Sequence, residues 1–352
     1  MNREMILEKI ISIDKTSMEQ ARKHWSSVGK PLFSLGLLEK AIINIAGIKR
    51  TVNYTLSKKG LVIMCADNGV VVEGVTQAGQ EVTAIVADNF TKGLTSVCLM
   101  SQVAGVDVFP VDIGMVVDVA SVSKPEEKVA YGTKNFAKEP AMTTAEVWQA
   151  IGVGIQKVKE LKEQGYEILA TGEMGIGNTT TSSAVASVLL GEQVEVLTGR
   201  GAGLDSKGLQ KKIDVIKAAI KKYQPNKEDA IEVLAKVGGL DLAGLTGVFL
   251  GGAIYGVPIV IDGLIASTAA LCAANICKLA KEYMIPSHVS KEPGGQVLLK
   301  ALGFEAFLTC GMFLGEGSGA VALFPLLDMA LKVYLEMGTF EDISVEQYEV
   351  LK

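Results

Sequence analysis

The chain has 352 residues, of which 49% are hydrophobic, and its formal net charge is −5 at pH 7. This length suits one large α/β domain or two smaller ones with a sizeable core. The negative charge and the lack of any basic block argue against nucleic acid as a partner. The two histidines, His24 and His288, are too few for a histidine-based metal site.

Five cysteines are scattered through the chain, mostly within apolar runs. An odd, dispersed set of this kind is typical of reduced, buried thiols in a cytosolic protein. The N-terminal sequence MNREMILEKI has neither the apolar core nor the cleavage site of a signal peptide. We therefore expect a cytoplasmic protein.

The first fifty residues are helical by pattern, and we expect the first thirty to form a cap on the main domain. Residues 5–13 and 17–28 are amphipathic, and Pro31 and Gly36 interrupt the chain before a third helix. Residues 60–67 then predict a buried strand, 70–80 a loop or short strand, 81–105 one helix, and 106–115 the next strand.

Polar residues follow these two strands. Asp67 and Asn68 end the first strand, and Asp112 lies near the end of the second. The carboxyl ends of parallel strands are where open α/β sheets bind ligands, although any single aspartate there is equally typical of a turn or helix cap. A polar loop with two prolines then spans 120–145, and MTTAEV predicts a helix that runs to about Gly165.

Residues 166–190 predict a strand, a glycine-rich turn and the start of a helix. Such a turn exposes backbone N–H groups at a helix N-terminus and so favours an anion. The sequence lacks the GK[ST] of a Walker phosphate loop, and a plain connection is the alternative reading. The candidate ligands in this turn are Glu173, Gly175, Gly177, Asn178, Thr179 and Thr180.

A second glycine cluster, with Gly201 and Gly203, precedes a helix that bears Lys211 and Lys212. A lysine in that place can be a phosphate ligand or part of a solvated helix face. Ser290 lies in a polar loop, residues 287–295, and is a candidate oxyanion contact.

Residues 242–261 contain no charge over twenty positions, a length that can span a bilayer. Pro258 divides the run, and its flanks are acidic rather than basic. We therefore expect a buried helix that ends near Gly256 and then a buried strand, with a membrane span as the alternative.

Glu316 lies alone between Gly315 and Gly317, with an apolar run on either side. An isolated carboxylate in apolar surroundings should have a raised pKa, which suits a general base or acid. The alternative is a glutamate at a helix N-terminus that is stabilised by the helix dipole.

Taken together, these segments resemble the nicotinate-nucleotide:dimethylbenzimidazole phosphoribosyltransferase family over about residues 30 to 340. The resemblance is carried by SLGLLE (34–39), ADNGVVVEGV (66–75), EVT (81–83), GTKNF (132–136), EPAMT (139–143), GEMGIGNTTTSSA (172–184), GRGAGLD (199–205), DGLIASTAAL (262–271), SHVSKEPG (287–294) and LGEGSGA (314–320). GEMGIGNTT followed by LGEGSGA is highly specific for the family.

The resemblance implies a Rossmann-like large α/β domain with a mainly parallel sheet, residues 55–320. It also implies a smaller helical domain built from residues 1–54 and 321–352. Members are usually homodimers and need no metal or other cofactor for catalysis. They transfer the phosphoribosyl group of nicotinate mononucleotide to an aromatic base, with inversion at the anomeric carbon.

Residue roles follow from the same resemblance. Glu316 matches the general base, and the turn from Glu173 to Thr180 matches the nucleotide contacts. The phosphate-side contacts match Gly201, Gly203, Lys212 and Ser290.

The chain departs from the family on the acceptor side. Asn68 stands where histidine is usual, Thr76 begins a stretch that replaces a Ser-aromatic-Pro run, and Ile85 replaces a common glutamine. With Leu314, these residues predict an altered, less polar acceptor pocket that suits a phenol, with adenine or another benzimidazole as alternatives. The departures also leave open a partner-dependent or non-catalytic subunit of a heterodimer with a paralogue.

Overall fold

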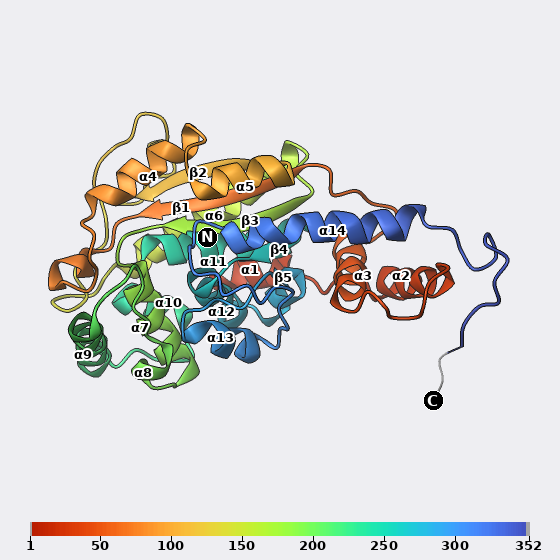
Figure 1. Ribbon diagram of the computed structural model, residues 1–352. Helices are drawn as coiled ribbons and strands as arrows, with labels where there is room; N and C mark the ends of the chain where they lie inside the picture. Colours follow the sequence, from red (N-terminus) through yellow and green to blue (C-terminus); the bar gives the residue numbers. More distant parts are fainter. Residues whose placement is uncertain (1, 350–352) are drawn as a thin grey trace.

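A five-stranded parallel sheet forms the centre of the computed structural model, which describes residues 2–349 (Figure 1). The strand order is β2-β1-β3-β4-β5. The strands are β1 (Lys59–Ala66), β2 (Val106–Gly114), β3 (Ile168–Met174), β4 (Ile259–Ile261) and β5 (Met284–Pro286). The predicted α/β class with a parallel sheet is confirmed.

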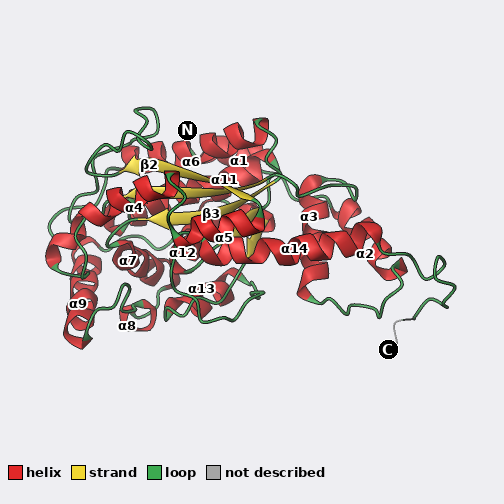
Figure 2. Cartoon of the chain, turned by 45° about the horizontal axis from the view of Figure 1, so that its top comes forward, coloured by secondary structure: helices red, strands yellow, loops and turns green. Residues whose placement is uncertain are grey.

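Helices cover both faces of the sheet, so the fold has three layers (Figure 2). Along β1, Leu61, Ile63 and Cys65 pack into one layer, and Val62 and Met64 pack into the other. All eight residues of β1 are buried, which explains its continuous apolar sequence.

The first layer contains α4 (Glu81–Thr91), α5 (Ser96–Ala104) and the N-terminal half of α14 (Ser318–Glu336). The second layer contains α6 (Thr144–Glu163), α7 (Asn178–Leu190), α10 (Ala230–Val237), α11 (Leu240–Tyr255) and α12 (Leu264–Ile276). Further helices are α8 (Val194–Leu197), α9 (Ser206–Tyr223), α13 (Gly294–Leu302), η1 (Gly69–Glu73) and η2 (Lys278–Tyr283).

The uncharged segment 242–261 lies in the core as most of helix α11 and strand β4, so it is not a membrane span. A Cβ atom on Gly247 would lie 2.1 Å from the Ile151 carbonyl oxygen, and one on Gly154 would lie 2.1 Å from that of Gly244. These glycines therefore bring the backbones of α11 and α6 into direct contact. Only α14, of the helices in residues 2–349, has the length and apolar composition to cross a bilayer, and 56% of that window is buried in the protein.

The single helix predicted over 81–105 is wrong, because the structure has two helices there. Gly93 adopts a φ of 71°, and the Thr95 side chain accepts a hydrogen bond from the Cys98 backbone N–H at 3.3 Å. A left-handed glycine ends α4 and an N-cap threonine begins α5. Residues 70–80, predicted as a loop or short strand, instead begin with the 3₁₀ helix η1 and continue as a loop.

The N-terminal and C-terminal segments meet at one side of the sheet (Figure 1). There α2 (Lys15–Ser27) and α3 (Leu37–Lys49) pack near the second half of α14, and the His24 ring donates a 2.6 Å hydrogen bond to the Tyr334 carbonyl. Helix α1 (Arg3–Lys9) lies apart from them and packs against α11 through Ile6. The domain boundaries at residues 54 and 320 stay a prediction.

Candidate active site

The strand order creates a switch point at the carboxyl edge of the sheet, between β1 and β3. Connections from these two strands leave in opposite directions, and doubly wound sheets bind ligands in the resulting crevice. Asn68 follows β1 and the turn from Gly175 to Gly177 follows β3, so both lie at this point. A Cβ on Gly175 would lie 2.5 Å from the Ala66 carbonyl oxygen, so only glycine allows the two strand ends to approach so closely.

Glu173 lies at the end of β3. It connects the glycine-rich turn after β3 with the loop that contains Glu316, two segments that the sequence analysis considered separately. Its Oε2 accepts a hydrogen bond from the Asn178 side-chain amide, and its Oε1 accepts one from the Glu316 backbone N–H at 3.4 Å. Burial raises the pKa of Glu173 well above its usual range. Burial thus favours the protonated form of this carboxyl group more than in water.

Glu316 is held in an unusual backbone conformation in front of α14. Gly315, Glu316 and Gly317 have φ angles of 85°, 61° and 93°, all in the left-handed region. Burial raises the pKa of Glu316, and the Val97 backbone N–H at the start of α5 partly opposes this effect. Its Oε2 is buried and has no hydrogen-bond partner among residues 2–349, so this oxygen has an unused capacity to accept a proton or a hydrogen bond.

Asp262 supports this loop and was not identified as a site residue from the sequence. Its carboxylate accepts hydrogen bonds from the backbone N–H groups of Gly317 at 3.2 Å, Gly319 at 2.8 Å and Ala320 at 3.1 Å. Asp262 thus caps α14 and fixes the backbone beside Glu316. The sequence did contain one indication of this role. Asp262 follows an apolar run that predicts a buried strand, and a charged residue in such a place needs a specific partner.

Asp241, in the first turn of α11, is a second carboxylate that the sequence did not single out. It is fully buried, and its Oδ1 accepts a 2.9 Å hydrogen bond from the Leu242 backbone N–H. Burial raises the pKa of Asp241 to about 6. Within residues 2–349, no cluster of His, Cys, Asp and Glu side chains is arranged to hold a metal ion.

Lys212 lies on α9 and is fully buried, whereas the neighbouring Lys211 is exposed. Its Nζ donates to Thr179 Oγ1 at 2.8 Å and to the Gly199 carbonyl at 3.2 Å. Burial lowers the pKa of Lys212 to about 8. A Cβ on Gly201 would lie 2.9 Å from Thr179 Oγ1, so both glycine-rich turns meet at this ammonium group.

The loop after β5 adds Ser290 and a residue that sequence reasoning missed, Glu292. Ser290 Oγ accepts a 3.3 Å hydrogen bond from the Glu292 backbone N–H. The Glu292 carboxyl packs so closely on Gly199 that a Cβ there would lie 1.7 Å from Oε2. Burial raises the pKa of Glu292, and the positive charge of Lys212 opposes this. Glu292 could have been found from the sequence because it lies two residues after Ser290 in the same polar loop.

The remaining predicted nucleotide residues differ in their surroundings. Gly177 has a φ of 93° and begins α7, and Thr180 is fully buried within the first turn of that helix. The Gly203 carbonyl accepts a hydrogen bond from the Gln77 side chain. The turn that contains Gly201 and Gly203 therefore touches the loop that contains Thr76.

The four predicted acceptor residues do not form one enclosed pocket. Asn68 is fully buried beneath the turn, where its amide donates to the Ile176 carbonyl at 3.4 Å. Thr76 is half-buried, whereas Ile85 and Leu314 are 56% and 54% exposed. Asn68 thus supports the turn from below, and the other three lie nearer the surface.

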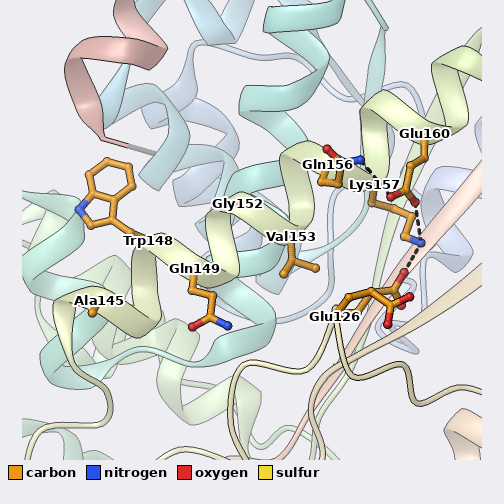
Figure 3. Close-up of a pocket in the computed structure, with 10 residues that line it drawn as sticks. Glu126, Ala145, Trp148, Gln149, Gly152, Val153, Gln156, Lys157 and Glu160 are labelled. Carbon is orange, nitrogen blue, oxygen red and sulfur yellow. Dashed lines mark hydrogen bonds and ion pairs between the residues drawn. The ribbon is translucent and has the colours of Figure 1, made fainter.

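A hollow of about 680 Å³ lies along the outer face of α6, away from these residues (Figure 3). Trp148 stands at one end, and at the other Lys157 forms an ion pair with Glu127 and another with Glu160 at 3.3 Å. None of the predicted site residues lines this hollow, so it is separate from the candidate active site.

Comparison with known proteins gives the identity of the family. A family model described as "Phosphoribosyltransferase" matches residues 10–345. The nicotinate-nucleotide–dimethylbenzimidazole phosphoribosyltransferase of Clostridium acetobutylicum is 47% identical over 352 residues, which cover 100% of both chains. The chain belongs to this phosphoribosyltransferase family. The enzyme of the same name from Ruminiclostridium cellulolyticum is 47% identical over 99% of both chains.

A solved phosphoribosyltransferase of the same name, from Thermus thermophilus, has the same fold. It superposes with a TM-score of 0.89 at 34% identity, covering 96% of this chain and 100% of that one. The predicted family, the Rossmann-like α/β fold and the assignment as a pentosyltransferase are therefore confirmed. The individual site residues stay predictions.

The buried carboxyl groups of this phosphoribosyltransferase predict a stability that falls as the pH rises from 5 to 7. Burial raises the pKa of Asp241 to about 6 and that of Glu173 well above normal. A folded-state pKa above the unfolded value means that the folded protein binds more protons, so stability is lost as the pH rises through that pKa. Asp241 alone should contribute a loss of about 1 kcal/mol.

Urea unfolding at pH 5, 6 and 7 measures this effect directly. The free energy of unfolding should be lowest at pH 7, and the dependence should weaken in Asp241→Asn. A free energy that is constant or rises over this range would show that these carboxyl groups are ionised normally in the folded protein.

Proposed function

We propose that this chain transfers the phosphoribosyl group of nicotinate mononucleotide to an aromatic base and so forms an α-ribotide for a cobamide. The observation that carries the proposal is the meeting of Glu173 with the Glu316 loop at the sheet switch point. The names of the relatives, phosphoribosyltransferases that act on nicotinate nucleotide and dimethylbenzimidazole, support the same chemistry.

In the proposed reaction, the hydroxyl oxygen of a phenol, or a ring nitrogen of a benzimidazole or adenine, attacks the anomeric carbon of the ribose. The bond from that carbon to the pyridinium nitrogen breaks, and its electron pair returns to the ring, which leaves as nicotinate. The acceptor's proton passes to Glu316, whose free Oε2 and raised pKa suit a general base. Because the leaving ring becomes neutral at nitrogen, the residues need only align the reactants and take one proton.

The donor half of the site is assigned by charge and hydrogen-bonding capacity. The buried ammonium of Lys212, which contacts Thr179, supplies a positive charge for the phosphate, and we assign Ser290 to the same side of the site. Backbone N–H groups of the turns at Gly175 and Gly201 add further donors. We place Glu173, whose pKa is raised by burial, beside the pyridine carboxylate or a ribose hydroxyl.

The acceptor half is the less polar one. Ile85 and Leu314 expose aliphatic surface. Thr76, which is half-buried, is the polar residue that we assign to the same pocket. Such a surface favours a flat aromatic acceptor with few polar groups, such as a phenol. A phenol hydroxyl has a pKa of about 10, so a base must still remove its proton during the attack.

A turnover panel with the purified chain tests the proposal. Nicotinate release from nicotinate mononucleotide would be measured with phenol, p-cresol, dimethylbenzimidazole, unsubstituted benzimidazole and adenine. We expect release with all active acceptors to depend on Glu316, and kcat/KM to be highest for a phenol. A strong preference for dimethylbenzimidazole would contradict the altered pocket while leaving phosphoribosyl transfer intact.

We place this enzyme in the cytoplasm. The same turnover measurements also test whether it acts as a homodimer or needs a second, paralogous chain. The exposed acceptor-side residues Ile85 and Leu314 favour a dimer in which a second chain covers them, either a copy of this chain or a paralogue. Turnover by the purified chain, with a dimeric mass by light scattering, supports the homodimer. Turnover that appears only when a paralogue is added supports the alternative of a partner-dependent subunit.

A further inference from the structure

His288 is a buried side chain to which the proposed reaction assigns no role. It follows the end of β5 and is only 4% exposed. An imidazole carries two polar nitrogens, so its burial is unfavourable unless they find partners. Ser287 Oγ and His288 Nδ1 share a 3.0 Å hydrogen bond, and Asp262 Oδ1 lies 4.0 Å from the same ring nitrogen. These contacts fix the place of the ring.

The ring lies against the first turn of α14. A Cβ atom on Gly319 would lie 1.9 Å from His288 Nδ1 and 2.1 Å from Cε1. Non-bonded atoms cannot come so close, so the backbone of α14 approaches the imidazole as closely as only a glycine allows. The ring also lies near the start of α12, because a Cβ on Gly263 would lie 3.6 Å from His288 Cε1 and equally far from Ser290 Oγ. His288 thus borders the N-terminal ends of two helices.

Asp262 holds the same turn of α14 by hydrogen bonds. Its Oδ1 accepts from the backbone N–H groups of Gly319 at 2.8 Å and Ala320 at 3.1 Å, and its Oδ2 accepts from that of Gly317 at 3.2 Å. These hydrogen bonds resist movement of the turn away from Asp262, and the imidazole of His288 occupies the space beside Gly319. The first turn of α14 is therefore fixed by a carboxylate and by the ring that lies next to that carboxylate.

The loop after β5 that carries His288 also contains Ser290, and it pairs with the segment that leads to Glu316. The Lys291 backbone N–H donates to the Met312 carbonyl at 2.9 Å. The loop is thus connected to the Glu316 segment twice. Backbone hydrogen bonding joins them before Glu316, and the His288 ring joins them after it, at the first turn of α14.

We infer that His288 is a positioning residue, whose buried ring sets the place of the first turn of α14 and thereby the position of Glu316 relative to Ser290. Glu316 is separated from α14 by Gly317 alone, so a shift of that turn moves the proposed base. The catalytic consequence rests on the proposed function, in which Ser290 lies on the phosphate side of the donor and Glu316 takes the acceptor's proton. A misplacement of about 1 Å can lower the rate of a reaction by about 100-fold.

Gly319→Ala tests the contact between the ring and the helix. Alanine is favoured over glycine within a helix, so a harmful effect would come from the overlap of the new methyl group with the imidazole. We expect kcat for nicotinate release to fall about 10- to 100-fold. The KM for nicotinate mononucleotide should change much less, since Lys212 and Thr179 lie on other elements. Gly152→Ala in α6 is the matched control, because a Cβ there would meet no other segment within 4 Å.

His288→Ala separates the role of the ring from a general disturbance of α14. Alone, it removes the support of the turn and should lower kcat about 10-fold or more. Combined with Gly319→Ala, it makes room for the methyl group, so the two losses in kcat should not multiply. His288→Asn keeps a polar group for Ser287 near the place of Nδ1, so it should lose less activity than His288→Ala.

Amide hydrogen exchange measures the position of the turn without turnover. The first N–H groups of a helix have no partner within it, so protection of Gly319 and Ala320 reports their hydrogen bonds to Asp262. Both amides should be protected in the unaltered protein, should exchange about 10-fold faster in His288→Ala, and should keep their rates in Gly152→Ala. Where His288→Ala does not fold, His288→Asn serves for the same comparison.

The outcomes separate this inference from the proposed function. No nicotinate release by the unaltered chain, alone or with a paralogue, overturns the proposed function, and amide exchange still decides the positioning role. The inference is overturned, while the proposed function stands, by full kcat in His288→Ala or by kcat losses that multiply in the double variant. Free exchange of Gly319 and Ala320 in the unaltered protein, or exchange that His288→Ala does not change, overturns it as well.

Discussion

Glu316→Gln should lower kcat for nicotinate release by about 10²- to 10⁴-fold, which is the usual contribution of a positioned general base. The glutamine has nearly the same shape but cannot take the acceptor's proton. Binding of nicotinate mononucleotide should change little, because the proposed phosphate and pyridine contacts lie on other segments. Initial rates of nicotinate release and calorimetric binding of the nucleotide would measure the two effects separately.

An exposed glutamate provides the control for this substitution. Glu305→Gln removes the same charge from a surface loop and should leave kcat unchanged. Full activity in Glu316→Gln would remove Glu316 from the reaction and leave its raised pKa as a consequence of burial alone.

Lys212→Met should reduce kcat/KM for nicotinate mononucleotide by about 10- to 100-fold, because a charge-assisted hydrogen bond to phosphate is lost. Burial lowers the pKa of Lys212 to about 8, so the free enzyme also loses this charge as the pH rises above 8. In the unaltered protein, KM for the nucleotide should therefore increase between pH 7 and pH 9. Steady-state rates across this range would show whether Lys212→Met abolishes the increase.

The adjacent lysine is a natural control, because Lys211 is exposed on the same turn of α9. Lys211→Met removes an equal charge within one residue and should change kcat/KM by less than about twofold. Equal losses in both variants would indicate a general electrostatic effect of the helix rather than a phosphate contact by Lys212.

The parts of the fold that depend on local sequence could be predicted. Continuous apolar runs identify β1 and β3, and the capping box at Thr143 and Glu146 identifies the start of α6. The turn between β3 and α7 was recognisable because its glycines and threonines stand together. The break at Gly93 was missed because the apolar spacing continues through it, so periodicity concealed a left-handed glycine followed by an N-cap.

The parts of the site that depend on distant contacts could not be predicted. Asp262 caps a helix that begins more than fifty residues later, and Asp241 packs against the segments that follow β1 and β3. Nothing in the local sequence of either residue indicates those partners. Asn68 is a further example: the sequence predicts it in the acceptor pocket, whereas its side chain lies buried under the turn that follows β3.

The left-handed backbone conformation of Glu316 lowers the stability of the folded protein at the same position that supplies the proposed base. A non-glycine residue in that region costs about 1 kcal/mol relative to a relaxed one, and glycines already occupy both neighbouring positions. Selection for heat resistance alone would therefore favour a third consecutive glycine and would delete the proposed base. An engineering programme for this enzyme must hold position 316 fixed and look for stability elsewhere.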